Sequence, residues 1–169
     1  MFWKPPQGNQ EKERVRSIFE PLVSPSVVDQ LLKGEVVRPP FAEEQIEFVF
    51  AIAAGCTPEE VNQHLSLIGE LAKEQDAQIN QMLCSLAVVD FRFHPKGKLA
   101  CESRRKLVEV IRENLGNKVK VVHGAANGHY GVFGSDKHIV SYTFSFPEFE
   151  AAIALLTRLK FGEIEELHR

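Results

Sequence analysis

Several side chains in this sequence have types and spacings that could support chemistry. Cys84 and Ser85 are adjacent, and either can act as a nucleophile where a general base stands beside it, although none is evident nearby. Asp90 lies in an otherwise apolar segment, where burial would perturb its carboxyl group. One hypothesis is therefore an enzyme of another class that uses Cys84, Ser85 or Asp90. The simpler interpretations are a buried structural Cys84 and an Asp90 at a strand edge or facing solvent.

Three histidines, His123, His129 and His138, fall within one glycine-rich region and raise the question of a metal site. Their spacing matches no usual zinc pattern, and no cysteine lies close by in the sequence. Surface or hairpin histidines are the simpler interpretation, so no metal site is predicted. The glycines from Gly124 to Gly134 form neither a dinucleotide fingerprint nor a P-loop, and bulges or tight turns in a twisted sheet account for them.

The composition is that of an ordinary soluble domain. The chain has 169 residues, of which 44% are hydrophobic and 25% charged, with a formal net charge of −3. No basic stripe is present, which argues against nucleic acid as a partner. No apolar run approaches the roughly 20 residues of a membrane-spanning helix. The three cysteines, Cys56, Cys84 and Cys101, suit a reducing cytoplasm, each as a small buried side chain.

The first 40 residues predict a tail and two helices. A helical pattern begins at Glu11 and ends at Pro21, with apolar residues Val15, Ile18 and Phe19 on one stripe. Ser24-Pro25 predicts the start of a second helix, which Gly34 ends. Residues 1–40 are therefore expected to form an N-terminal tail and helical lead-in, followed by one domain over residues 41–169.

That domain alternates strands with helices. Strands are predicted at residues 45–53, 79–83, 86–93, 118–125 and 138–144, with a hairpin about Cys84 and Ser85. The segment Thr57-Pro58-Glu59-Glu60 is a capping box that opens a helix, and a further helix is predicted over residues 99–115. This order indicates a mixed sheet covered by helices, in the α+β class.

The C-terminal part carries three weaker patterns. Ser145-Phe146-Pro147-Glu148 is a second capping-box candidate, opening a helix that runs to about Leu159. The acidic residues 163–166 are interpreted as a solvated helix end. Arg104-Arg105-Lys106 is interpreted as a solvated helix face.

Two segments resemble signatures of the class III adenylate/guanylate cyclase catalytic domain. Residues 48–58 resemble its F-A-D-I-x-G-F-T pattern, with Ile52 at the position of the first metal-binding Asp. Residues 80–85 resemble its N-K-x-x-G-D core, with Gln81 at the base-reading Lys and Ser85 at the second metal-binding Asp. Residues 19–32, 121–135 and 142–143 resemble further family segments in the expected order. The resemblance covers the chain from about Arg14 to about Leu159.

The resemblance implies a nucleotide-cyclase-like fold with a ferredoxin-like βαββαβ core. The family's two Asp hold Mg²⁺ or Mn²⁺, and hard cations need anionic oxygen ligands. Ile52 has no ligand atom and Ser85 only a neutral hydroxyl. The family's transition-state Asn and Arg fall at Glu150 and Ala154, and a one-turn shift would bring Arg158 to the Arg position without an Asn. No catalytic residue, metal or cofactor is therefore predicted.

The leading hypothesis is a catalytically inactive cyclase-like domain that serves as a dimerisation or regulatory module in bacterial-type signalling. It would be cytoplasmic and form a homodimer, or a heterodimer with another signalling domain. The family carries a further strand or two after its late helix, and these are expected to be missing. The alternative is a small-ligand or nucleotide sensor that uses the remodelled pocket, with candidate residues Phe50, Ile52, Gly55, Thr57, Met82, Cys84 and Ser85.

Overall fold

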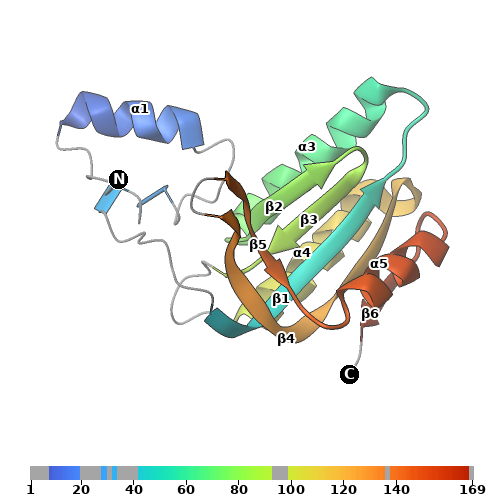
Figure 1. Ribbon diagram of the computed structural model, residues 1–169. Helices are drawn as coiled ribbons and strands as arrows, with labels where there is room; N and C mark the ends of the chain where they lie inside the picture. The colour runs from blue at the N-terminus through green and yellow to red at the C-terminus, as the bar shows by residue number, and fades with distance from the viewer. Residues whose placement is uncertain are drawn as a thin grey trace.

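The structure is a computed structural model that describes residues 8–19, 28–29, 32–33, 42–92, 99–135 and 138–167. Helix α1 (Asn9–Phe19) comes first in the chain (Figure 1). The elements that follow are β1 (Ala42–Ala53), α3 (Pro58–Glu74), β2 (Gln78–Leu83), β3 (Leu86–Asp90), α4 (Ala100–Leu115), the 3-10 turn η1 (Gly116–Lys118), β4 (Val119–Ser135), β5 (His138–Ser145), α5 (Phe149–Arg158) and β6 (Ile164–Leu167).

The strands form one sheet in the order β2-β3-β1-β4-β5, and β6 also pairs with β4. The β4–β6 pair is parallel, and the other described pairs are antiparallel. β6 and β5 share one edge of β4, β6 at residues 121–124 and β5 at residues 129–135. The predicted α+β class, mixed sheet and βαββαβ core are confirmed.

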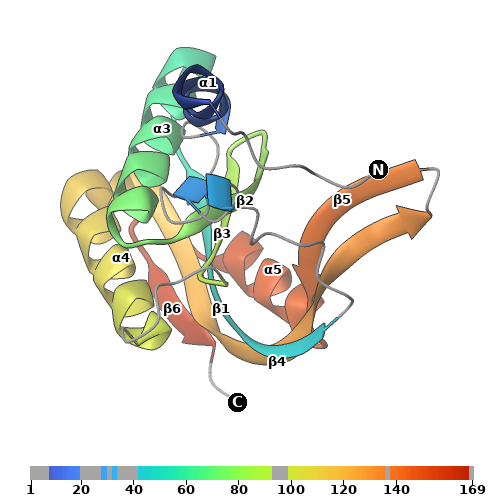
Figure 2. The ribbon, with the colours of Figure 1, turned by 90° about the vertical axis from the view of Figure 1, so that its left-hand side faces the viewer.

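The central strand β1 is buried on both faces over most of residues 46–53, which explains the apolar run from Phe48 to Ala53. Alternate residues of a strand point to opposite faces. Val49, Ala51 and Ala53 pack in a core with residues of α3 and α4, whereas Phe48 and Phe50 pack in a second core with residues of α5. Figure 2 shows α3 and α4 on one side of the sheet and α5 on the other.

Aromatic rings dominate the core beneath α5. Phe48 stacks on Phe146 with ring centroids 4.7 Å apart, and Phe50 meets the edge of Phe149 at 5.3 Å. Such pairs add about 0.5–1.5 kcal/mol each beyond the burial of their area. Since Phe149 begins α5, this cluster fixes where the helix sits on the sheet.

The predicted capping box at the start of α3 is confirmed. The hydroxyl of Thr57 accepts a hydrogen bond from the backbone N–H of Glu60 at 3.2 Å, and Pro58 occupies the first helical turn. The carboxylate of Glu60 accepts in return from the backbone N–H of Cys56 at 2.7 Å. Side chains at the start of the helix therefore satisfy the amides of Cys56 and Glu60.

The predicted hairpin is also confirmed. Its turn is formed by Cys84 and Ser85, and the backbone of Cys84 has a φ of 54°. Within β2 the register shifts between Ile79 and Gln81, so Asn80 is an extra residue that forms a bulge.

The strand predicted over residues 118–125 proves longer, because β4 continues without a break to Ser135. Gly124 and Gly128 lie inside it instead of ending it. A Cβ on Gly128 would lie 2.3 Å from the carbonyl oxygen of Ser145 and 2.5 Å from the side chain of Ile46. Glycine is required there for close approach. A register shift does occur between Phe133 and Gly134, as the glycine pattern predicted.

Two predictions for the C-terminal part are wrong. Ser145 is the last residue of β5, where it pairs with His129, so it does not cap α5; the N-cap is Glu148, without a side-chain cap. The acidic segment is not a helix end but strand β6, whose residue Ile164 pairs with Val121. The sheet therefore continues beyond α5, against the expectation that the later strands are missing.

The N-terminal lead-in is described in part. Helix α1 confirms the first predicted helix, although Ile18 on its stripe is exposed. Of the second predicted helix, residues 28–29 and 32–33 are helical, and Val28 is fully buried. Arg16 forms an ion pair of 2.7 Å with Asp29. The rest of that helix and the boundary near residue 40 lie outside the described residues.

Candidate functional site

The end of β1 and the β2–β3 turn meet at one end of the sheet. The backbone N–H of Ala53 donates to the carbonyl of Ser85 at 2.9 Å, and Ile52 pairs in register with Leu86. Residue 52 and residue 85, far apart in the sequence, are thus neighbours in the fold. The sheet brings together the two positions that the sequence comparison singled out.

The surroundings of Ile52 are apolar. Its side chain is half-buried and packs against the aromatic core, as does that of Leu86. Ile52 presents no oxygen or nitrogen atom, and the half-buried Ser85 offers one neutral hydroxyl. Mg²⁺ and Mn²⁺ prefer carboxylate oxygens, so these residues do not fit the two cations that a cyclase-like site would hold.

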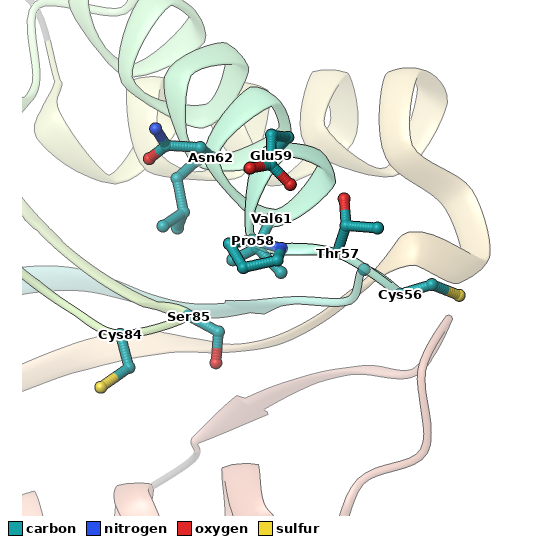
Figure 3. A pocket seen from close by; sticks show the side chains of 10 residues that line it. Cys56, Thr57, Pro58, Glu59, Val61, Asn62, Cys84 and Ser85 are labelled. Atoms are coloured by element: carbon teal, nitrogen blue, oxygen red, sulfur yellow. The ribbon is translucent and has the colours of Figure 1, made fainter.

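A cleft of about 670 Å³ opens beside these positions, between the first turn of α3 and the β2–β3 turn (Figure 3). Of the residues predicted for a ligand pocket, Gly55, Thr57, Cys84 and Ser85 line it. Phe50, Ile52 and Met82 are not among its lining residues. Phe50 is fully buried in the core, and Met82 is about half exposed near Gly69 of α3. The other lining residues are Cys56, Pro58, Glu59, Val61, Asn62 and Leu65.

The cleft is lined by both apolar and polar side chains and is slightly acidic. Among its described lining residues Glu59 carries the single formal charge, and there is no lysine or arginine. The amides of Cys56 and Glu60 are already bonded within the helix start. A helix N-terminus binds anions through free amides, so this one is poorly equipped for phosphate.

The expectation of buried cysteines is wrong at the cleft. Cys56 and Cys84 are exposed, and Cys101 is intermediate. Cys56 lies in the short loop between β1 and α3, and Cys84 lies in the β2–β3 turn. Neither side chain packs into the core. Figure 3 places Cys84 and Cys56 on different loops of the cleft, with their sulfur atoms pointing apart.

The remaining degenerate positions lie outside this cleft. Gln81 is exposed on β2, and Glu150 and Ala154 are exposed on α5, as is Arg158. None of these four lines the cleft. Like Ile52, they are therefore not part of the cleft that Ser85 lines.

Asp90 was expected at a strand edge or facing solvent, but it is fully buried. Its carboxylate accepts from Gln78 Nε2 at 3.0 Å, Asn80 Nδ2 at 2.8 Å and the backbone N–H of Arg92 at 3.0 Å. Burial raises the pKa of the Asp90 carboxyl above its usual range, against the lowering effect of these bonds. The side-chain amides of Gln78 and Asn80, on the neighbouring strand, were the sequence signal that could have indicated a buried, hydrogen-bonded Asp90.

A tyrosine and an arginine complete this polar cluster. The guanidinium of Arg92 lies over the ring of Tyr130 at 4.4 Å and 3.7 Å from the carboxylate of Glu44. Tyr130 is almost fully buried, and burial raises the pKa of its hydroxyl. Glu44, Arg92 and Tyr130 are separated widely in sequence, so no local pattern indicated this arrangement.

Arg104 is buried, which corrects the prediction of a solvated helix face; Arg105 and Lys106 are exposed as predicted. Its guanidinium donates to Glu47 at 2.7 Å and to Glu166 at 2.8 Å, and it also contacts Nδ1 of His123. The hydrogen bond from Arg104 lowers the pKa of Glu166. The signal was present in α4, since Arg104 precedes Leu107 and Val108 at helical spacing and so lies on the buried face.

This contact also bears on the three histidines. His123 is buried against Arg104, whereas His129 is exposed, and six residues along one strand correspond to about 20 Å. The side chain of His138 is outside the described residues. No group of three or more metal-ligating side chains occurs in the part of the chain that the structure describes.

The sequence matches no protein-family model and no curated protein. Solved structures do match. A bacterial light-regulated adenylyl cyclase superposes with a TM-score of 0.66 at 11% identity, over 91% of this chain and 52% of the other. The adenylyl cyclase CyaB from P. aeruginosa gives 0.57 at 16% identity, over 77% and 80%. The monomeric guanylyl cyclase domain of the RhoGC fusion protein from Blastocladiella emersonii gives 0.59 at 11%, over 76% and 84%.

The chain has the fold of adenylyl and guanylyl cyclase domains. At these identities the likeness is one of fold, and the predicted cyclase-like architecture is confirmed. The chain spans about half the length of the light-regulated cyclase. Among the described residues, no helix is both long enough and apolar enough to cross a membrane.

Proposed function

We propose that this chain is a catalytically inactive cyclase-like domain that acts as a dimerisation or regulatory module in signalling. The observation that supports this most directly is the proximity of Ile52 and Ser85 at one end of the sheet, where Ile52 pairs with Leu86 and the backbone N–H of Ala53 donates to the carbonyl of Ser85. Ile52 and Ser85 stand where the resemblance places two metal-binding carboxylates. The fold has kept the two positions together, and neither residue supplies a charged ligand.

Ile52 lacks the metal-binding carboxylate that the resemblance places here, and it also contributes to the core. Its side chain packs with Leu86 against the aromatic cluster, so an apolar contact replaces an ionic site. On α5, Glu150 would present a negative charge where the resemblance expects a residue that stabilises a triphosphate. Metal-binding and transition-state functions are both affected.

A turnover assay tests the inactive state. Purified protein is incubated with ATP or GTP and with Mg²⁺ or Mn²⁺, and cyclic nucleotide is measured by mass spectrometry. We expect no product above a protein-free blank. Product formation that Ser85→Ala abolishes and that the exposed-helix control Ser66→Ala retains would contradict the proposal.

Restoring the carboxylates tests the assignment of the two positions. Ile52→Asp with Ser85→Asp should create Mn²⁺ binding, measurable by isothermal titration calorimetry, because the resemblance places metal-binding carboxylates at these two neighbouring positions. The wild-type chain and a matched control with two aspartates at exposed α3 positions, Gln63→Asp with Ser66→Asp, should not bind. A folded double variant without Mn²⁺ binding would show that these are not the metal positions.

Ile52→Asp alone should lower the free energy of unfolding by roughly 2–4 kcal/mol, since it buries a carboxyl in apolar surroundings. Denaturation in urea measures this loss. Ser85→Asp, in a half-buried turn, should change it by less than about 1 kcal/mol. The Mn²⁺ titration of the double variant is therefore interpreted together with its folded fraction, which the urea denaturation gives.

The alternative of a small-ligand or nucleotide sensor is supported by the cleft itself, although Phe50, Ile52 and Met82 do not line it. Its test is a thermal-shift panel of nucleotides and metabolites with the wild-type chain and Ser85→Leu, which places a larger apolar side chain in the lining of the cleft. A shift that disappears in Ser85→Leu would support the sensor. No shift across the panel would count against it.

A further inference from the structure

The buried cluster of Arg104, Glu47, His123 and Glu166 has no part in the cleft or in the proposed function. It joins four elements: α4 supplies the arginine, and β1, β4 and β6 supply the other three side chains. Arg104 Nε donates to Glu47 Oε2 at 2.7 Å, and Arg104 Nη2 donates to Glu166 Oε1 at 2.8 Å. The third nitrogen, Nη1, contacts Nδ1 of His123. One guanidinium therefore ties a helix to three strands.

The contact with His123 depends on protonation. Arginine has donors only, so the Nδ1 atom of His123 must act as the acceptor, which requires a neutral imidazole. A protonated imidazolium carries N–H groups on both nitrogens. It would set a second donor and a second positive charge against Nη1 of Arg104. Histidine is the side chain whose ordinary titration falls near neutral pH.

The carboxylates around His123 act in the opposite direction and have to be weighed. Glu166 is its direct register partner on β6, Glu47 lies on β1, and α4 adds Arg105 near Glu166. Both carboxylates are bonded to Arg104. The bonds to Arg104 use Oε1 of Glu166 and Oε2 of Glu47, so each carboxylate has a second oxygen. Even if a protonated His123 donates to one of these oxygens, its Nδ1 no longer accepts from Nη1 of Arg104, and that contact is lost.

Strand β6 is the element whose attachment depends most on this contact. It has four residues, and among the described strands it pairs with β4 alone. Its side-chain tie to α4 runs through Glu166 and Arg104. Loss of a bond at Arg104 therefore loosens both α4 and the short strand that Arg104 helps to hold.

We propose that this cluster is a pH-sensitive switch, in which protonation of His123 weakens the attachment of α4 and β6 to the rest of the sheet. The switch is independent of whether the cleft binds nucleotide or metal. It makes one side of the cyclase fold responsive to mild acid.

Hydrogen exchange followed by mass spectrometry tests the switch on the full chain, at about pH 7.5 and about pH 5.5, with correction for the intrinsic exchange rate. Protection in α4 and β6 should fall about tenfold at the lower pH, the effect expected for the loss of one hydrogen bond to a charged group, here the contact between Arg104 and His123. Helix α5 serves as the internal reference and should keep its protection. His123→Gln retains an oxygen acceptor for Arg104 and cannot be protonated, so it should lose the pH response.

The matched control is His129→Gln, which removes an exposed histidine from the same strand and should respond like the wild type. An equal response in wild type and His123→Gln overturns the switch, as does unchanged protection in the wild type. If His123→Gln does not fold, Arg104→Met replaces it, because without the guanidinium protonation has no contact to break. A tenfold loss that persists in Arg104→Met also overturns the proposal.

Discussion

Asp90 and Arg104 show how single buried charges organise this fold. Each is held by partners on other elements: Asp90 by Gln78 and Asn80 of β2, and Arg104 by Glu47 of β1. Removing one partner of such a group leaves the other desolvated, which is the expensive outcome. These residues therefore contribute more to register and element placement than to net stability.

The raised pKa of Asp90 predicts a pH dependence with a definite sign. In the unfolded chain an aspartate loses its proton near pH 3.9, whereas folded Asp90 keeps it to higher pH. Between these values the folded state binds more protons, so stability due to Asp90 is present at low pH and is lost as the pH rises. The wild type should therefore lose stability relative to Asp90→Asn as the pH increases from about 4 towards neutrality.

Urea denaturation of both proteins across this range measures the difference, and the other carboxyl groups cancel. A wild type that gains stability over Asp90→Asn with rising pH would contradict the assignment of a raised pKa.

Among the elements, β4 sets the shape of the sheet because it runs beside β1, β5 and β6. Its long course depends on glycine at position 128, where the Cβ of any other residue would meet the carbonyl oxygen of Ser145 at 2.3 Å. Backbone cannot move out of the way as a flexible side chain can. The close approach of β4 to the end of β5 therefore requires that one residue.

Gly128→Ala should lower the free energy of unfolding by about 3 kcal/mol through this clash. The matched control is Gly69→Ala in α3, where the nearest atom to the new Cβ is Met82 Cε at 3.7 Å, an ordinary contact. That substitution should stabilise the protein by about 0.5–1 kcal/mol, because alanine favours a helix over glycine. Thermal or urea denaturation compares the two, and equal losses would show that the Gly128 contact is not limiting.

For the whole molecule, the proposed function predicts a stable dimer whose mass does not depend on nucleotide. Size-exclusion chromatography with light scattering, with and without ATP, GTP and Mn²⁺, measures this. A monomer would favour a missing partner chain. A dimer that forms only with a ligand would favour the sensor.

Local patterns predicted those parts of the fold that short segments determine. The capping box at Thr57, the hairpin turn at Cys84 and the apolar run of β1 depend on neighbours in sequence, and all three are confirmed. The helical spacing of Arg104 to Leu107 and Val108 indicated its burial, but its acceptors Glu47 and Glu166 could not be predicted because they lie on distant strands. Strand β6 was missed for the same reason, since an acidic segment becomes a strand only beside β4.

For the candidate site, too, one part could be predicted from the sequence and another part could not. The adjacency of Ile52 and Ser85 followed from the resemblance, and the structure places them side by side. The lining of the cleft did not follow, because the direction of a side chain at the end of a strand depends on register. Phe50 and Ile52 point to the aromatic core, while the loop residues from Gly55 onward form the cleft.

The pairing of β1 with β4 at the centre of the sheet has a consequence for how the chain assembles. Between these two strands the sequence contains α3, the β2–β3 hairpin and α4. The hairpins close over short loops, whereas the central pair must join segments separated by most of the domain, at a higher cost in chain entropy. We expect the most buried strands to meet late in folding, with the preformed hairpins and helices as the pieces that they join.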